Sequence, residues 1–315
     1  MADLTKYNDA SKIAKGGFEY VKGLVLGGEW DIPTLCRMCD DYVLDSLSKV
    51  YKKENKGIAF PCCVSPNGIV GYNCTGTLVQ GDLVKVELGV DIGGCTSIVG
   101  GTFVNGQGTD GHNKFISLLE TLAKGVLNEI KIGNTNIDVK TYVESLCTEH
   151  SCFPIENCMS YQHFPGHIRT DESKYIVLNH KKYYDDDDML LVEPNICFEF
   201  LDGEVYHINL TIVPDNETEH KYTFGNAQIL RFNDLYYSLK LKHSKQFNYT
   251  VKKDHGTNAF RLSEYTSPGD RLGMRECLES GILDSYPVKT VKENYNVYFK
   301  KFTVVIHNGS AKKLL

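Results

Sequence analysis

Two β-rich stretches with turn glycines constrain the fold of this chain most. Residues 58–70 form the first stretch, and residues 83–104 form the second. Within the second stretch, Gly93 and Gly94 lie between two runs rich in β-branched residues, which is the pattern of a hairpin. The sequence therefore predicts a long antiparallel strand pair within a β-sheet.

Helical spacing of apolar side chains marks the segments around these strands. Residues 4–26 carry such a pattern, and Asp31 followed by Pro33 marks the start of a second helix, because proline suits the first helical turn. Apolar periodicity predicts further helices and a closing strand over residues 112–130, 136–147, 271–283 and 297–306. With no internal repeat, this order indicates one compact α/β domain spanning residues 1–315.

The composition is that of a globular protein, with 42% hydrophobic and 23% charged residues. The net charge of -6 argues against general nucleic-acid binding over the whole surface, although a local basic face remains compatible with it. No apolar run approaches the ~20 residues of a transmembrane helix, and the N-terminus lacks the apolar core of a signal peptide. Eleven cysteines without a framework spacing fit reduced thiols. We therefore expect a protein of the cytoplasm or the nucleus, with no membrane partner.

Several short, colinear stretches resemble the pita-bread fold of the creatinase and methionine aminopeptidase superfamily. They include the loop at residues 56–61, the strand at residues 81–90 and the closing stretch at residues 301–304. The resemblance is closest to the non-peptidase, proliferation-associated and ErbB-receptor-binding branch. It implies an α/β, methionine aminopeptidase-like pita-bread fold with a polar insertion at residues 215–270.

The resemblance also implies which positions would hold metal. Peptidases of this fold use two aspartates, one histidine and two glutamates, because two hard cations need several oxygen ligands and bridging carboxylates. The five positions here are occupied by Glu87, Ile98, Tyr161, Asn209 and Lys301. A substrate-facing histidine of the family corresponds to Gly71.

Only Glu87 among these positions keeps a carboxylate, and Lys301 places an ammonium where a bridging carboxylate is expected. A unit charge about 4 Å from a cation costs roughly 4 kcal/mol per charge at an effective dielectric constant of ~20. We therefore expect no metal, no cofactor, no small-molecule substrate and no peptidase activity. Glu87 and Lys301 are instead expected to be able to form a buried salt bridge in place of the metal.

The insertion carries a cluster of basic side chains next to aromatic ones. Its basic members are Lys240, Lys242, His243, Lys245, Lys252 and Lys253. Such side chains can contact phosphates while the aromatic rings stack on bases. An exposed β-hairpin kept soluble by lysines explains the same composition. The resemblance favours RNA binding, since relatives of this branch associate with the large ribosomal subunit near the tunnel exit, partly through this insertion.

The acidic run Asp185 to Asp188 is expected to be a solvated loop.

Three groups of thiols could carry other chemistry: Cys147, His150, Cys152 and Cys158; Cys36 and Cys39; and Cys62 and Cys63. The first group contains soft ligands for zinc, but its spacing is not that of a standard finger or ribbon. The second group lies in a helix and lacks the strand that precedes a thioredoxin-like motif. The third group is expected to line a pocket. We favour packing roles for the first two groups.

The sequence therefore predicts a catalytically inactive, methionine aminopeptidase-like protein that acts as a ribosome-associated factor. It would dock on the large subunit near the nascent-chain tunnel exit, partly through contacts with ribosomal RNA. One alternative is a metal-dependent methionine aminopeptidase with an atypical site around Glu87. The other is a cytoplasmic or nuclear adaptor that binds proteins. The relatives also carry a long lysine-rich C-terminal tail, whereas this chain ends at Leu315.

Overall fold

The computed structural model describes residues 3–166, 173–179, 196–214, 222–233, 235–292 and 295–314. Its helices are α1 (Leu4–Val25), α2 (Ile32–Ser48), α3 (Asp110–Glu129), α4 (Asn136–Glu149), α5 (Lys242–His255) and α6 (Pro268–Glu279). The strands of the main sheet are β2 (Lys56–Pro66), β5 (Leu83–Ile92), β6 (Cys95–Val104), β7 (Phe153–Pro154), β8 (Ser160–His163), β9 (Tyr175–Ile176), β10 (Val205–Val213), β16 (Tyr298–His307) and β17 (Ser310–Lys313).

The shorter strands form three smaller sheets. They are β1 (Trp30–Asp31) with β4 (Thr77–Leu78); β11 (Tyr222–Phe224), β15 (Lys289–Val291) and β3 (Ile69–Gly71); and β12 (Ile229–Phe232), β13 (Phe260–Arg261) and β14 (Leu283–Tyr286). A single 3₁₀ turn, η1 (Leu262–Glu264), follows β13 in the described part of the chain.

The main sheet is antiparallel, with strand order β2-β5-β6-β16-β10-β8-β9. β17 pairs with β16, and β7 pairs with β10. The predicted hairpin is confirmed: β5 and β6 pair over their whole length, and their turn has φ of +62° at Gly93 and +83° at Gly94. Glycine adopts these angles without the steric penalty that a side chain brings. The sequence therefore predicts this strand pair and its turn correctly.

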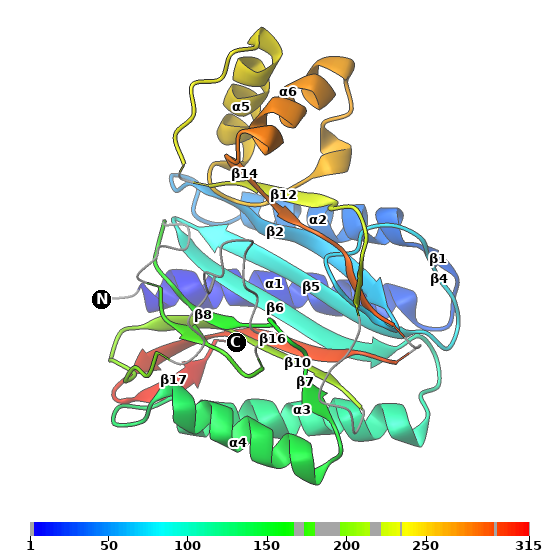
Figure 1. Cartoon of the computed structure of the whole chain (residues 1–315), viewed down its shortest axis with the longest axis vertical. Coiled ribbons are helices and arrows are strands. Elements are labelled where there is room, and N and C mark those ends of the chain that lie inside the picture. The colour runs from blue at the N-terminus through cyan, green and yellow to red at the C-terminus, as the bar shows by residue number, and fades with distance from the viewer. Residues whose placement is uncertain are drawn as a thin grey trace, which may run out of the picture.

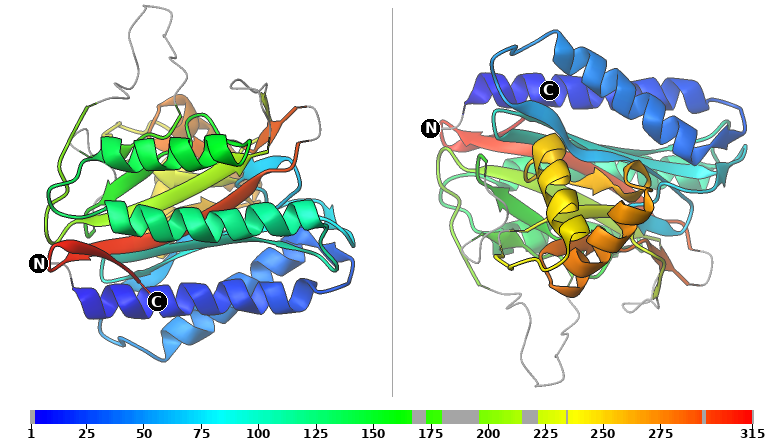
Figure 2. Two further views of the ribbon diagram at one scale, coloured as in Figure 1. Left: turned by 90° about the horizontal axis from the view of Figure 1, so that it is seen from below. Right: turned by 90° about the horizontal axis from the view of Figure 1, so that it is seen from above.

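Two pairs of helices pack on the main sheet (Figure 1). α1 and α2 pack against β2, β5 and β6 through a core that includes Leu35, Val86 and Leu88. α3 packs against β10 and β16, and α4 packs against α3, β7 and β9, around a second core that includes Leu122 and Phe302. Figure 2 shows the sheet from below, with α3 and α4 in front of it, and from above, with α5 and α6 in front of it. None of the helices in the described part of the chain is long and apolar enough to cross a membrane.

Local sequence signals set the helix ends. The Asp31 side chain accepts a hydrogen bond from the Thr34 backbone N–H, and Pro33 lies in the first turn of α2. This arrangement satisfies a backbone donor that the helix itself leaves unpaired. α6 begins in the same way, with a capping box between Ser267 and Asp270. The predicted start of α2 is therefore confirmed, and α6 begins three residues before the predicted residue 271.

α5 and α6 form a small helical unit above the sheet (Figure 1), on the three strands β13, β12 and β14. The unit has its own core, which includes Leu230, Phe247, Phe260 and Met274. The β-hairpin considered for the lysine-rich segment is wrong, because residues 242–255 form α5. Buried side chains at Ser244, Phe247 and Val251 recur at helical spacing, and the lysines occupy the exposed positions between them.

Candidate functional site

A row of residues crosses four strands of the main sheet. The strand register pairs Glu87 with Gly100, Gly100 with Lys301, and Lys301 with Asn209. Residues opposite one another on neighbouring strands share a face of the sheet. Glu87, Lys301 and Asn209 therefore face the same side. Gly100 has no side chain, so the side chains of Glu87 and Lys301 can meet across it.

Glu87 and Lys301 form a buried ion pair. Lys301 Nζ lies 2.5 Å from Glu87 Oε2, and the two side chains are 10% and 4% exposed. This confirms the expected salt bridge. Burial lowers the pKa of Lys301, but the charge of Glu87 and its hydrogen bond outweigh burial, so the pKa of Lys301 is raised and the ammonium stays charged. Glu87 Oε1 accepts a hydrogen bond from the Tyr72 backbone N–H at 3.0 Å. Both oxygens of the carboxylate are thus engaged.

β3 ends directly beside this ion pair. A Cβ added at Gly71 would lie 2.8 Å from Glu87 Oε1 and 3.9 Å from Lys301 Nζ. Tyr72 follows with φ of +66°, a left-handed conformation that is costly for a bulky residue. Its backbone hydrogen bond to Glu87 and the packing of its ring, with centroids 5.7 Å from Phe60 and 5.2 Å from Tyr286, hold it there. The carboxylate thus fills the space that a side chain at position 71 would need.

The five positions that the resemblance assigns to metal ligands lie around one cavity of about 560 Å³. They are Glu87, Ile98, Tyr161, Asn209 and Lys301, and all five line it. Gly71 instead lines a neighbouring cavity of about 310 Å³, which shares Tyr72, Met159, Asn209 and Lys301 with the larger one. The fold therefore assembles the positions that the sequence analysis selected, and their functional roles remain predictions.

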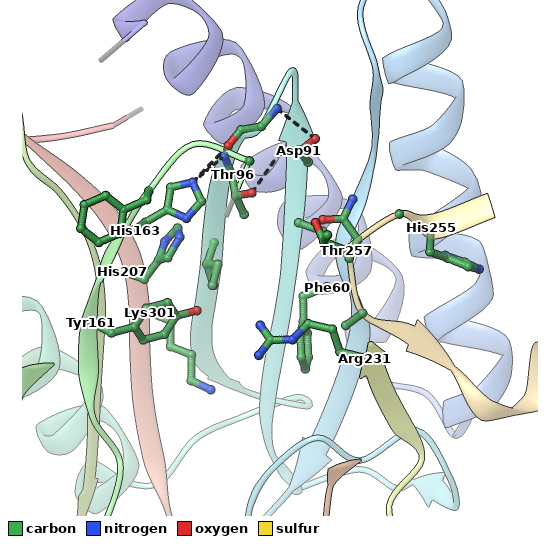
Figure 3. Close-up of a pocket in the computed structure, with 18 of the residues that line it drawn as sticks. Phe60, Asp91, Thr96, Tyr161, His163, His207, Arg231, His255, Thr257 and Lys301 are labelled. Atoms are coloured by element: carbon green, nitrogen blue, oxygen red, sulfur yellow. Dashed lines mark hydrogen bonds between the residues drawn. The ribbon is translucent and has the colours of Figure 1, made fainter. Parts of the chain in front are cut away.

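The larger cavity has two unlike walls (Figure 3). Tyr161, His163 and His207 lie on one side, and Phe60, Arg231 and Thr257 lie on the other. His163 is held by the Gly94 carbonyl at 3.2 Å, and burial lowers its pKa to about 4, so it is neutral at physiological pH.

Several polar groups that line this cavity already have partners. Thr96 Oγ1 donates to Asp91 Oδ1 at 3.1 Å, and Arg231 pairs with Asp284 at 3.1 Å. No serine or cysteine is among the described residues that line the cavity, so it offers neither of these nucleophiles. At about 560 Å³, the cavity is large enough to hold a small ligand.

A two-metal centre does not fit these residues. Ile98 has an aliphatic side chain, and the Asn209 side-chain oxygen accepts a hydrogen bond from Thr211 at 2.7 Å. The Lys301 ammonium lies where a cation would need a carboxylate. Across the described ranges, no group of three or more His, Cys, Asp and Glu side chains is arranged to hold a metal ion. We therefore derive no metal chemistry from this site.

The six basic residues of the insertion are exposed on or next to α5: Lys240, Lys242, His243, Lys245, Lys252 and Lys253. The same helix ends at the larger cavity, because residues 255–259 line its wall. Glu276 of α6 accepts hydrogen bonds from the backbone N–H groups of Lys240 and Leu241 and so holds the start of α5. We name this exposed basic set the α5 lysine surface.

Nine of the eleven cysteines are buried, whereas Cys158 is half-buried and lines the smaller cavity and Cys197 is exposed. Cys62 and Cys63 do not line either cavity, so the expectation that they line a pocket is wrong. β2 has two register shifts between Ile58 and Cys63, and the thiols lie in the core between α2 and the sheet. Cys63 Sγ lies 3.5 Å from Cys74 Sγ, and no cysteine of the described chain forms a disulfide. The residues considered for zinc are not among any metal-holding group in the described ranges.

Sequence reasoning missed several residues of this region. Tyr72, Arg231, His207 and Lys289 line the cavities, yet none lies in a recognisable motif. The alternation of polar His207, Asn209 and Thr211 with apolar residues along β10 was the available signal for His207, which pairs with Tyr161 of β8. Arg231 and Lys289 lie on strands outside the main sheet, and tertiary structure alone brings them here. The acidic run Asp185 to Asp188 lies outside the described residues.

The model of metallopeptidase family M24 matches residues 6–227 of this chain. Among curated proteins, ErbB-3 binding protein 1 of Arabidopsis thaliana is 26% identical over 320 residues, which are 98% of this chain and 79% of that protein. The curved DNA-binding protein of Schizosaccharomyces pombe is 26% identical over 331 residues, which are 98% of this chain and 84% of that protein. The predicted resemblance is confirmed.

Solved structures show the same fold. A thermophilic Arx1 superposes with a TM-score of 0.84 at 22% identity, covering 99% of this chain and 90% of that structure. The methionine aminopeptidase of Thermotoga maritima superposes with a TM-score of 0.62 at 13% identity, covering 99% of this chain and 96% of that structure. The pita-bread fold class is confirmed.

Proposed function

Because this chain belongs to metallopeptidase family M24, we propose that it is a member without peptidase activity that acts as a ribosome-associated factor. It would dock on the large ribosomal subunit near the nascent-chain tunnel exit, with the α5 lysine surface on ribosomal RNA. The ion pair between Glu87 and Lys301 is the main observation in support of the proposed loss of peptidase activity. This pair supports an evolved replacement of the metal centre, because the Lys301 ammonium neutralises Glu87, the one carboxylate among the five positions.

The test of inactivity uses the purified full chain. We expect no stoichiometric divalent metal in the protein and no cleavage of a Met-Ala peptide when cobalt, manganese or zinc is added. Metal-dependent cleavage that Glu87→Gln abolishes would overturn this proposal. It would instead establish the alternative, a methionine aminopeptidase with an atypical site around Glu87.

Helix electrostatics support a binding role for the α5 lysine surface. Lys242 and Lys245 lie in the first turn of α5, which has no acidic residue there. Cations at a helix N-terminus oppose the helix dipole, so helix stability does not account for them. The Schizosaccharomyces pombe relative, which is 26% identical over 98% of this chain, is named for binding curved DNA. This name supports nucleic acid as the class of ligand.

Reversing the charge of Lys240, Lys242 and Lys245 to glutamate together is expected to weaken ribosome binding without lowering the stability of the domain. Each phosphate contact that is lost should reduce the dependence of log affinity on log salt by about one. Glutamates in the first turn of α5 also favour the helix dipole, so the thermal midpoint should not fall. Co-sedimentation with purified large subunits over a series of salt concentrations measures the affinity and its dependence on salt. Thermal unfolding of the variant measures the midpoint.

The matched control reverses Lys12, Lys49 and Lys124, three exposed lysines on α1, next to α2 and on α3, with the same change in net charge. This control should bind like the unmodified chain. Equal weakening by both triple variants would mean that only the overall charge matters. Binding that ignores salt would remove RNA phosphates as the anchor. Sedimentation apart from ribosomes at every salt concentration would contradict the ribosome-associated role and favour a protein-binding adaptor.

A further inference from the structure

The smaller cavity, of about 310 Å³, lies between the main sheet and the three-stranded sheet β11-β15-β3. In the smaller sheet, the register pairs Phe224 with Lys289, and Lys289 with Gly71. All three residues of this row line the cavity. Across from them, Asn209 of β10 and Lys301 of β16 line it as well. Two lysines from different sheets therefore share one cavity.

Lys289 is a partly buried cation without an ion pair in the described part of the chain. Its Nζ donates to the Glu156 backbone carbonyl at 2.8 Å and lies 3.7 Å from the centroid of the Tyr222 ring. Burial lowers its pKa, the sign that its charge is desolvated more than it is compensated. An ammonium has three donors, so the carbonyl and the ring face leave Lys289 with donor capacity for an anion.

The opposite wall adds further donors. Lys301 Nζ donates to Glu87 and lies 4.7 Å from the centroid of the Phe299 ring and 5.3 Å from that of Tyr72. Only one of its three hydrogens is used by a hydrogen-bond acceptor in the described part of the chain. Asn209 uses its side-chain oxygen to accept from Thr211, so its amide nitrogen is the part that remains for a ligand. Gly71 lies between the two lysines and has no side chain to separate them from the cavity.

The charge balance of this cavity is positive. Lys289 and Lys301 are its charged lining residues, and no carboxylate is among the described residues that line it. Glu87, which reaches Lys301 from the neighbouring cavity, neutralises one of the two charges. The buried Glu156 carboxylate, just outside the cavity lining, raises the pKa of Lys289 less than burial lowers it, so the Lys289 charge is only partly compensated. In this partly desolvated space, attraction to an anion is stronger than in water.

We propose that the smaller cavity binds the carboxylate of a small organic acid, with Lys289, Lys301 and the Asn209 amide as its donors. The remaining lining explains why the anion would carry an apolar body, because Val70, Met159, Phe224 and Pro287 supply carbon surface. Phe224 is 61% exposed and covers the rim. A bound acid would be a ligand and not a substrate. This site stands independently of the ribosome-associated role, so either can fail alone.

The experiment titrates the full chain with sodium benzoate, sodium 4-methylpentanoate, inorganic phosphate and the neutral analogue benzamide, by calorimetry at constant ionic strength. Benzoate or 4-methylpentanoate is expected to bind, and benzamide is not. Lys289→Met should weaken the affinity for the carboxylate by at least about ten-fold, because it removes the uncompensated charge. Lys292→Met, at an exposed lysine three residues away, is the matched control and should leave the affinity unchanged.

Asn209→Asp gives a second, independent test if Lys289→Met does not fold. It places a carboxylate beside Lys301 and should abolish carboxylate binding. Binding of neither organic acid would overturn the proposal. So would equal binding of benzamide, or an affinity that neither Lys289→Met nor Asn209→Asp changes. Preferential binding of inorganic phosphate would overturn the assignment to an organic carboxylate.

Discussion

Replacing Lys301 with methionine is expected to lower the free energy of unfolding by about 3–5 kcal/mol, because it strands the Glu87 charge in the core. The pair is buried, with 10% and 4% of the two side chains exposed. Attraction between the charges offsets the cost of removing both from water, and that offset disappears with the ammonium. Urea denaturation followed by circular dichroism measures the change as a shift of the midpoint at constant slope.

The neighbouring lysine supplies the control. Lys300 pairs with Glu120, a carboxylate that is 55% exposed, so Lys300→Met should cost only about 0–1 kcal/mol. The double variant Glu87→Gln with Lys301→Met leaves no buried charge and should regain most of the stability. A loss of less than about 1 kcal/mol in Lys301→Met would contradict the role of the pair as the replacement for metal in holding the sheet.

Arg261→Met is expected to cost a similar 3–5 kcal/mol near neutral pH, since it removes the partner of a second buried carboxylate. Arg261 Nη2 lies 2.8 Å from Asp40 Oδ2 and also donates to the Cys62 carbonyl at 2.8 Å. Asp40 Oδ1 accepts from the Cys62 backbone N–H at 2.9 Å. These contacts join the strands under α5 and α6 to α2 and to β2.

The cost of Arg261→Met should depend on pH. Burial raises the pKa of Asp40 to about 6, against the opposing effect of Arg261. Between about pH 4 and pH 6, the folded chain therefore holds a proton that the unfolded chain releases, so the contribution of Asp40 to stability falls as pH rises. Without Arg261, the folded pKa rises further and this fall extends to higher pH. The difference between the variant and the original chain should thus be larger at about pH 8 than at about pH 5.5.

Chemical denaturation at these two pH values provides the measurement. Arg275→Met, which removes an exposed pair with Glu279 on α6, serves as the control and should cost about 0–1 kcal/mol at both. A cost of Arg261→Met that stays constant with pH would show that the loss of Arg261 does not raise the folded pKa of Asp40. A cost as small as that of Arg275→Met would show that the helical unit does not depend on this contact.

Sequence reasoning worked best where a local pattern and the long-range arrangement agree. The hairpin at Gly93 and Gly94 needs only a turn and two strands, and both are visible in the sequence. The pair of Glu87 and Lys301 was predictable because the resemblance supplied the long-range contact between residues 214 positions apart. Without it, neither residue carries any local sign of burial.

The failures have physical causes. The lysines of α5 suggested a soluble strand edge, but Ser244, Phe247 and Val251 at helical spacing decide the structure. Cys62 and Cys63 were misplaced because register shifts in β2 change which side chains enter the core. Lys289 gave no signal, since its environment combines neighbouring strands of its own small sheet with residues of the main sheet. Propensity and spacing describe neighbours in the chain, whereas a cavity is made by segments that are distant in it.

The contact between Gly71 and Glu87 limits which residues position 71 can hold. Any side chain at position 71 would meet Glu87 Oε1 at 2.8 Å, and moving that carboxylate would take away the partner of Lys301 and the hydrogen-bond acceptor of Tyr72. A histidine at position 71 is therefore expected to destabilise the chain. Position 71, the Glu87 carboxylate and Lys301 are thus coupled, and a larger residue at position 71 fits only together with changes at the other two positions.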